Sequence, residues 1–274
     1  MPYRFARYFV GLTLVVIIIG FWNSYFVPIA KVPTAFHVHA FTALSWVSLL
    51  LFQDWAIRSR RRGLHKIGGL LSLFLFPFLI VGFVMIINVS ATAYAADESP
   101  TARFLGPSFG LSMLFAILAY LTVFYLALKH RRRVRMHAGY MLTTPLILFE
   151  SPFSRIMLSY MPFLVFTNSD FPQRILDAIV ISMALSIAFA IFLYLRDRKS
   201  GIPFLVASVF MFAQATSIYV GTRIEWVRQA FEVYAQIPEG LTILIGFVLG
   251  MAVSWFGWRS VNYRSVPNEA PSSA

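Results

Sequence analysis

Two histidines stand where a membrane protein could present them to a cofactor. His65 and His137 each follow a cluster of arginines and each open a long apolar run. Because clusters of this kind lie on one side of a membrane, we expect both side chains at the same depth. Two imidazoles from different helices at one depth are what axial ligation of haem requires. The pattern predicts a single haem b held by His65 and His137. The alternatives are contact with a quinone or another lipophile, and interfacial residues that bind no cofactor.

Polar side chains inside the apolar runs form a second candidate site. A charge near the centre of a bilayer is costly, so an ionisable residue there is a functional hypothesis by default. Arginine cannot shed its proton, and Arg155 therefore needs a carboxylate, an anion or a water-filled cavity. The expected intramembrane cluster consists of His39, Glu150, Arg155, Asp177 and Gln214. It admits two interpretations: an ion pair of Arg155 with Glu150 or Asp177 that joins helices, and the site of a small transporter or channel.

The run that carries Glu150 and Arg155 also holds Pro145 and Pro152. Proline removes a backbone donor and clashes with a preceding carbonyl, so it kinks a transmembrane helix. We therefore expect a kinked helix whose bend lines a cavity beside Glu150.

The amino-acid composition and the absence of known motifs limit which cofactors, metal sites and catalytic groups the chain can provide. The chain has no cysteine, which rules out disulfides, thiolate metal ligands and iron–sulfur ligation. His37 and His39 have no evident third partner, so no metal site is predicted. Walker, Gly-x-Ser-x-Gly and His-Glu-x-x-His signatures are absent, which disfavours a protein nucleophile but leaves enzymatic activity open. The net charge of +12 comes from short basic loops, a pattern that indicates membrane orientation and not a nucleic-acid partner.

The elements that position these residues are apolar helices. Of the 274 residues 59% are hydrophobic and 12% are charged, far below the ~25% charged residues of soluble domains. Windows of about 20 residues, enough to cross the ~30 Å hydrocarbon core, predict an all-α, polytopic membrane bundle of about eight transmembrane helices. These spans are expected near residues 7–27, 36–57, 65–89, 106–128, 138–160, 174–195, 202–222 and 240–258. They form one domain over residues 1–262, followed by a disordered cytoplasmic tail over 263–274.

Basic residues set the expected orientation. Seventeen lysines and arginines fall on one side of the predicted spans, five fall on the other, and Arg155 lies within a span. Because basic loops stay cytoplasmic, we expect both termini in the cytoplasm and the protein in the inner membrane of a bacterium, with the lipid bilayer as its partner. The amphipathic segment 223–240 predicts a helix that lies on the outer membrane surface or caps the bundle, or else an extension of the preceding span.

Four segments carry a resemblance to known proteins. They are Phe36-His37-Val38-His39, Gly63-Leu64-His65-Lys66-Ile67-Gly68-Gly69, His137-Ala138-Gly139-Tyr140-Met141-Leu142 and Ser151-Pro152-Phe153-Ser154-Arg155-Ile156. Their succession over residues 36–156 resembles an uncharacterised family of bacterial multi-span inner-membrane proteins. The Leu-His-basic-x-Gly element is similar to one in cytochrome-b561-like haem-binding membrane proteins, and this similarity implies haem. Ala138 and Gly139 stand where the family has a basic pair, and the family has no established activity.

Three hypotheses for function follow from these observations. The first is a redox-type membrane protein that binds haem b, a quinone or another lipophile. The second is a small transporter or channel that works through Glu150, Arg155 and Asp177. The third is a structural or assembly subunit that associates with other membrane subunits of a larger complex.

Overall fold

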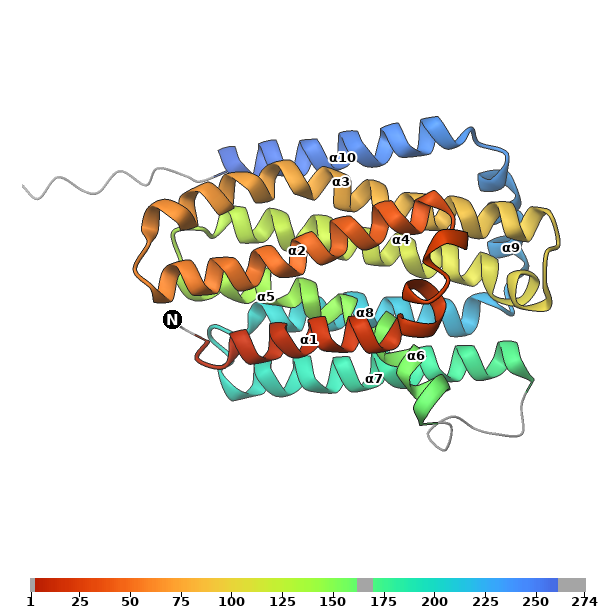
Figure 1. Cartoon of the computed structure of the whole chain (residues 1–274), viewed down its shortest axis with the longest axis horizontal. Coiled ribbons are helices and arrows are strands. Elements are labelled where there is room, and N and C mark those ends of the chain that lie inside the picture. Colours follow the sequence, from red (N-terminus) through yellow and green to blue (C-terminus); the bar gives the residue numbers. More distant parts are fainter. Residues whose placement is uncertain (1–2, 162–169, 261–274) are drawn as a thin grey trace, which may run out of the picture.

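The long helices of this protein pack side by side in a bundle (Figure 1). The computed structural model describes residues 3–161 and 170–260, and every regular element within them is helical. The elements are α1 (Ala6–Gly20), the π-helical turn η1 (Trp22–Phe26), the 3-10 turn η2 (Ile29–Lys31), α2 (Thr34–Arg58), α3 (Arg62–Ala95), α4 (Pro100–Lys129), α5 (Val134–Leu148), α6 (Glu150–Tyr160), α7 (Phe171–Arg196), α8 (Ile202–Gly221), α9 (Glu225–Ala235) and α10 (Glu239–Arg259). The predicted all-α class is confirmed. The tail expected over 263–274 lies outside the described residues.

Six of the described helices are long and apolar enough to cross a membrane, namely α2, α3, α4, α7, α8 and α10. Each coincides with one predicted span. The shortest of them, α8, has 20 residues, or about 30 Å at 1.5 Å per residue, which matches the hydrocarbon core. The chain is therefore a polytopic membrane protein whose apolar outer surface contacts lipid.

The other two predicted spans, residues 7–27 and 138–160, are not continuous helices. The first consists of α1, which has only 15 residues, followed by η1, where Val27 N donates to Trp22 O at 2.9 Å. The second breaks at Phe149 into α5 and α6. Pro152 has no N–H to offer the carbonyl four residues earlier, so the helical hydrogen-bond ladder is interrupted there. The expected kink is confirmed, whereas the expected count of about eight transmembrane helices is not.

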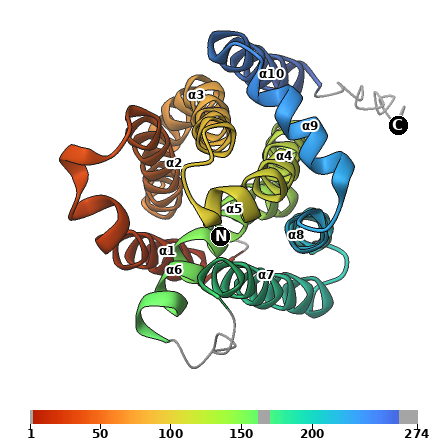
Figure 2. The ribbon, with the colours of Figure 1, turned by 90° about the vertical axis from the view of Figure 1, so that its right-hand side faces the viewer.

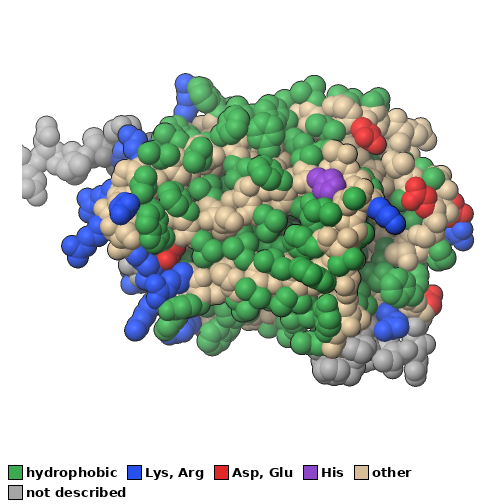
Figure 3. All heavy atoms as spheres, in the orientation of Figure 1, with side chains coloured by type: hydrophobic (Ala, Val, Ile, Leu, Met, Phe, Trp, Pro, Cys, Tyr) green, Lys and Arg blue, Asp and Glu red, His purple; other side chains and the backbone are tan. Residues whose placement is uncertain are grey.

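The turns between helices gather basic side chains at one end of the bundle (Figure 3). The α2–α3 and α4–α5 connections lie at this end, together with the last residues of α7 and α10 (Figure 1). We call it the basic end, defined by Arg58, Lys129, Arg196 and Arg259. Most of the acidic side chains visible in Figure 3 lie toward the opposite end. Basic loops that are far apart in the sequence thus lie together at one end of the bundle.

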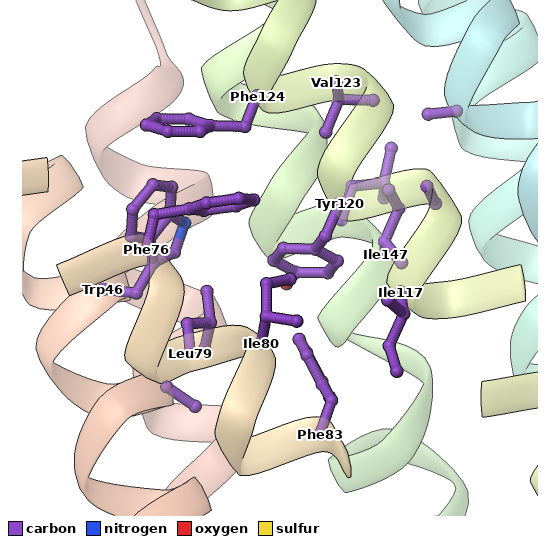
Figure 4. Close-up of a cluster of buried hydrophobic side chains, with 14 of the residues drawn as sticks. Trp46, Phe76, Leu79, Ile80, Phe83, Ile117, Tyr120, Val123, Phe124 and Ile147 are labelled. Carbon is purple, nitrogen blue, oxygen red and sulfur yellow. The ribbon is translucent and has the colours of Figure 1, made fainter. Parts of the chain in front are cut away.

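The centre of the bundle is an aromatic core (Figure 4). Phe76 of α3 and Phe124 of α4 stack with ring centroids 4.0 Å apart, and Trp46 of α2 packs against both rings. The Trp46 indole N–H donates to the Thr144 hydroxyl of α5 at 2.8 Å, and the Tyr120 hydroxyl of α4 donates to the Thr144 carbonyl at 2.7 Å. Thr144 therefore ties α2 and α4 to α5 inside an apolar environment, where a polar group without a partner is costly.

Helix α9 closes the end of the bundle opposite the basic end (Figure 2). Its Phe231 is buried against Gly110 of α4, where an added Cβ would come within 2.3 Å of the ring. The Tyr234 hydroxyl donates to the Asn88 side-chain oxygen of α3 at 2.5 Å, and Asn88 also bonds to Thr242 of α10 at 2.9 Å. The expectation of a capping helix is confirmed, and that of a simple extension of α8 is wrong.

Candidate functional site

A cavity of about 260 Å³ opens between α1, η1, α2 and the break between α5 and α6. It adjoins the first turns of α2, in the half of the bundle away from the basic end. Its rim includes the exposed Ser24 and the partly exposed Tyr25 and Leu44, so the cavity reaches the outer surface of the bundle. The lining residues are Ile17, Phe21, Ser24, Tyr25, Phe26, Phe36, His39, Ala40, Ala43, Leu44, Leu148, Ser151 and Arg155. The walls are mostly apolar, with a few polar groups, as in most small-molecule sites.

Two local features build this cavity. The π-helical turn η1 directs Ser24, Tyr25 and Phe26 into its wall, and π-helical turns occur frequently at functional sites. The second feature is the close approach of α1 to α6 at Gly20. A Cβ at this position would lie 2.2 Å from the carbonyl oxygen of Pro152, so only glycine lets α6 come this near. The proline that breaks the helix thus also places α6 beside α1.

Arg155 is the charged residue of the cavity wall. Its Nη1 donates to the Ser151 carbonyl at 2.8 Å and to the Ser151 hydroxyl at 3.0 Å. The guanidinium lies over the Phe21 ring at 4.6 Å, a cation–π contact. Among the described residues nothing accepts a hydrogen bond from its Nε or Nη2. Ser151 therefore fixes the guanidinium through Nη1, and Nε and Nη2 remain available to donate to a ligand.

The carboxylates predicted to pair with Arg155 do not contact it. Within residues 3–161 and 170–260 no carboxylate oxygen lies within 4.0 Å of the guanidinium. Glu150 lies five residues before Arg155 at the start of α6 and forms no ion pair with it. Asp177 instead accepts a hydrogen bond from Gln173 at 2.8 Å. The predicted ion pair is thus not formed with either carboxylate.

His39 faces the same cavity from α2. Its Nδ1 is buried and has no hydrogen-bond partner among the described residues, and its ring packs on Phe83 with centroids 5.0 Å apart. A Cβ at Gly82 would come within 3.0 Å of the His39 Cα, so α3 holds this part of α2 closely. The cavity therefore brings together a cation and an imidazole with an unsatisfied nitrogen.

Gln214 lies away from the cavity, between α8 and α4. The Ser112 hydroxyl of α4 donates to its backbone carbonyl at 3.2 Å, and its side-chain oxygen is buried without a partner among the described residues. Of the predicted intramembrane cluster, the structure joins His39 and Arg155, with Glu150 at longer range. Asp177 and Gln214 do not line the cavity.

His65 near the start of α3 and His137 near the start of α5 both lie toward the basic end. The His137 Nδ1 donates to the Ala127 carbonyl at 2.9 Å, and the His65 Nδ1 bonds to the Gln53 side-chain oxygen at 2.7 Å. Both acceptors are carbonyl oxygens, so Nδ1 carries the proton in each ring and Nε2 is left as a ligand atom. Two such imidazoles meet the donor requirement of haem. No group of three or more metal-binding side chains occurs in the described part of the chain.

The sequence predicts a cavity at the bend beside Glu150, and Leu148, Ser151 and Arg155 from this bend line the cavity while Glu150 does not. The wall that η1 supplies is not predicted, because η1 falls within a window that is apolar enough to indicate one uninterrupted span. The available signal is Asn23-Ser24, two polar residues between the aromatic residues Trp22 and Tyr25. Phe21 is equally hidden, since its contact with Arg155 depends on the fold. Searches against known protein families, curated proteins and solved structures find no match for this chain.

Proposed function

We propose that this protein binds a lipophile that enters the cavity from the bilayer, with a quinone as the redox-active member of that ligand class. The observation that carries the proposal is Arg155, a guanidinium with spare donors and no carboxylate in contact, in an apolar cavity that reaches the outer surface. A quinone head has carbonyl oxygens that accept from Arg155 and His39, and its hydrocarbon chain suits the apolar wall. Transport through an Arg155–Asp177 cluster has less support, because Asp177 bonds elsewhere.

The proposal includes an orientation. The positive-inside rule supports both termini in the cytoplasm of a bacterium and the protein in its inner membrane. In this arrangement α1 with η1 makes one crossing, and α5 with α6 makes another that is broken at Phe149. Together with the six long helices these give eight crossings of a single bundle domain.

Filling the cavity tests whether it binds a lipophile. Ala40 of α2 lines the cavity, so Ala40→Phe should reduce photo-cross-linking of a short-chain azidoquinone to background. The matched control is Ser48→Phe on the exposed side of the same helix, which should label as the wild type does. Equal labelling of all three proteins, with label found outside the cavity, would show that the cavity is not the ligand site.

Haem b is a second candidate, supported by the protonated Nδ1 of both His65 and His137 and by their place toward the same end of the bundle. A b-type haem would use the two Nε2 atoms as axial ligands and would supply one-electron chemistry. The acceptors at Gln53 and Ala127 would then orient the rings and raise their basicity as ligands.

Removal of one imidazole tests this candidate. Protein purified from cells supplied with haem should show a Soret band, and His65→Ala should abolish it because one axial ligand is lost. His39→Ala, which removes a histidine from the other half of the bundle, should leave the band unchanged. A colourless wild-type protein under these conditions would exclude haem without bearing on the lipophile cavity.

A further inference from the structure

The described residues of the cavity wall include a positive charge and no negative charge. Arg155 is the one permanently charged residue among the described residues of the wall, and no aspartate or glutamate joins it there. A charge at intramembrane depth is costly and needs compensation. Within contact distance the protein supplies one serine and the face of one phenyl ring, neither of which carries charge, and the nearby Glu150 makes no ion pair with Arg155. A bound anion would complete the site.

The placement of the guanidinium suits an anion made of paired oxygens. Ser151 engages Nη1 and Phe21 covers one face of the group, so its plane is held in one orientation. Arginine offers two parallel N–H donors, a geometry that matches a carboxylate. His39, with a buried and unpartnered Nδ1, is a second polar group in the same wall.

The rest of the cavity suits an apolar chain. Ile17, Ala43, Leu44 and Leu148 supply aliphatic wall, and a volume of about 260 Å³ holds a head group and part of a chain but not a whole lipid. The remainder of the chain would leave past the rim at Leu44 and lie in the bilayer.

We propose that the lipophile this cavity prefers is an anionic single-chain amphiphile, bound more tightly than a neutral lipophile such as a quinone, with its carboxylate on Arg155 and its hydrocarbon chain directed to the lipid. This inference rests on the proposed function and names the ligand class of the same site. Glu150 begins α6, five residues before Arg155. When ionised, it is a competing negative charge that opposes a second carboxylate at the guanidinium.

The test compares two ligands with identical tails. The full chain in phosphatidylcholine nanodiscs should bind oleate about ten- to a hundredfold more tightly than oleyl alcohol, the range of a charge-assisted hydrogen bond. Arg155→Met should remove this preference, because it weakens the binding of oleate far more than the binding of oleyl alcohol. Glu150→Gln should strengthen oleate binding and leave oleyl alcohol unaffected. The wild-type comparison needs no variant, so it stands even if Arg155→Met does not fold.

The outcomes separate the two proposals. If oleate and oleyl alcohol bind equally and both are displaced by Ala40→Phe, the anionic ligand is wrong and the lipophile cavity stands. If neither binds and no azidoquinone label enters the cavity, both proposals fail. Adding phosphatidylglycerol to the nanodiscs identifies the source of the anion. Loss of oleate binding would overturn the single-chain carboxylate in favour of a phospholipid phosphate, and unchanged binding would support the free acid.

Discussion

Gly20→Ala should destabilise the protein by about 1–3 kcal/mol, the usual range for an added group in a packed interior. The new Cβ would lie 2.2 Å from the Pro152 carbonyl oxygen, and the obstacle is backbone and not a flexible side chain. Relief of the clash requires α6 to move away from α1. Because α6 carries Arg155, the variant should also lose ligand binding in the cavity.

The matched control lies on the same helix. Gly11 has no atom within 4 Å of an added Cβ, so Gly11→Ala should stabilise α1 by about 0.5–1 kcal/mol through helix propensity alone. Unfolding in mixed detergent micelles measures both free energies. If the two substitutions shift the unfolding free energy in the same direction, the contact between Gly20 and Pro152 does not hold α1 to α6.

Six of the spans could be predicted because lipid imposes a property that each segment carries by itself. A helix such as α8 needs about 20 apolar residues to satisfy the bilayer, and no other part of the chain is needed to recognise it. The two broken spans, residues 7–27 and 138–160, could not be predicted in this way. Pro145 and Pro152 indicate a kink, but nothing within the segment indicates that α1 packs beside Pro152. That contact joins residues more than a hundred positions apart.

The candidate site likewise has features that the sequence predicts and features that depend on the fold. The common depth of His65 and His137 follows from the basic loops beside them, whereas the Ala127 carbonyl that orients His137 belongs to another helix and has no signal in the sequence. The contacts of Arg155 also depend on the fold. Five residues separate it from Glu150, which sets the two about 140° apart on a regular helix, and the break at Phe149 does not bring them into contact. The guanidinium lies against Phe21 instead.

Trp46→Ala should have the largest effect on stability, a loss of about 3–5 kcal/mol. Trp46 is 1% exposed and packs on Phe76 and Phe124 (Figure 4), so its truncation leaves a cavity at the centre of the bundle. Trp22, which is 51% exposed, provides the matched control, and Trp22→Ala should stay within about 0.5 kcal/mol of the wild type. Unfolding free energies in the same micelles compare the two variants.

The hydrogen bond from Trp46 to Thr144 can be separated from the packing. Thr144→Val keeps the shape of the side chain but removes the oxygen that accepts from the indole N–H. Hydrogen bonds between membrane helices are worth about 0.6 kcal/mol on average and about 1.7 at most, so this variant should lose far less than Trp46→Ala. Since the two residues are in contact, their double mutant should be non-additive by about the hydrogen-bond energy. A loss for Thr144→Val as large as that for Trp46→Ala would mean that the polar link, and not the aromatic packing, holds α2 to α5.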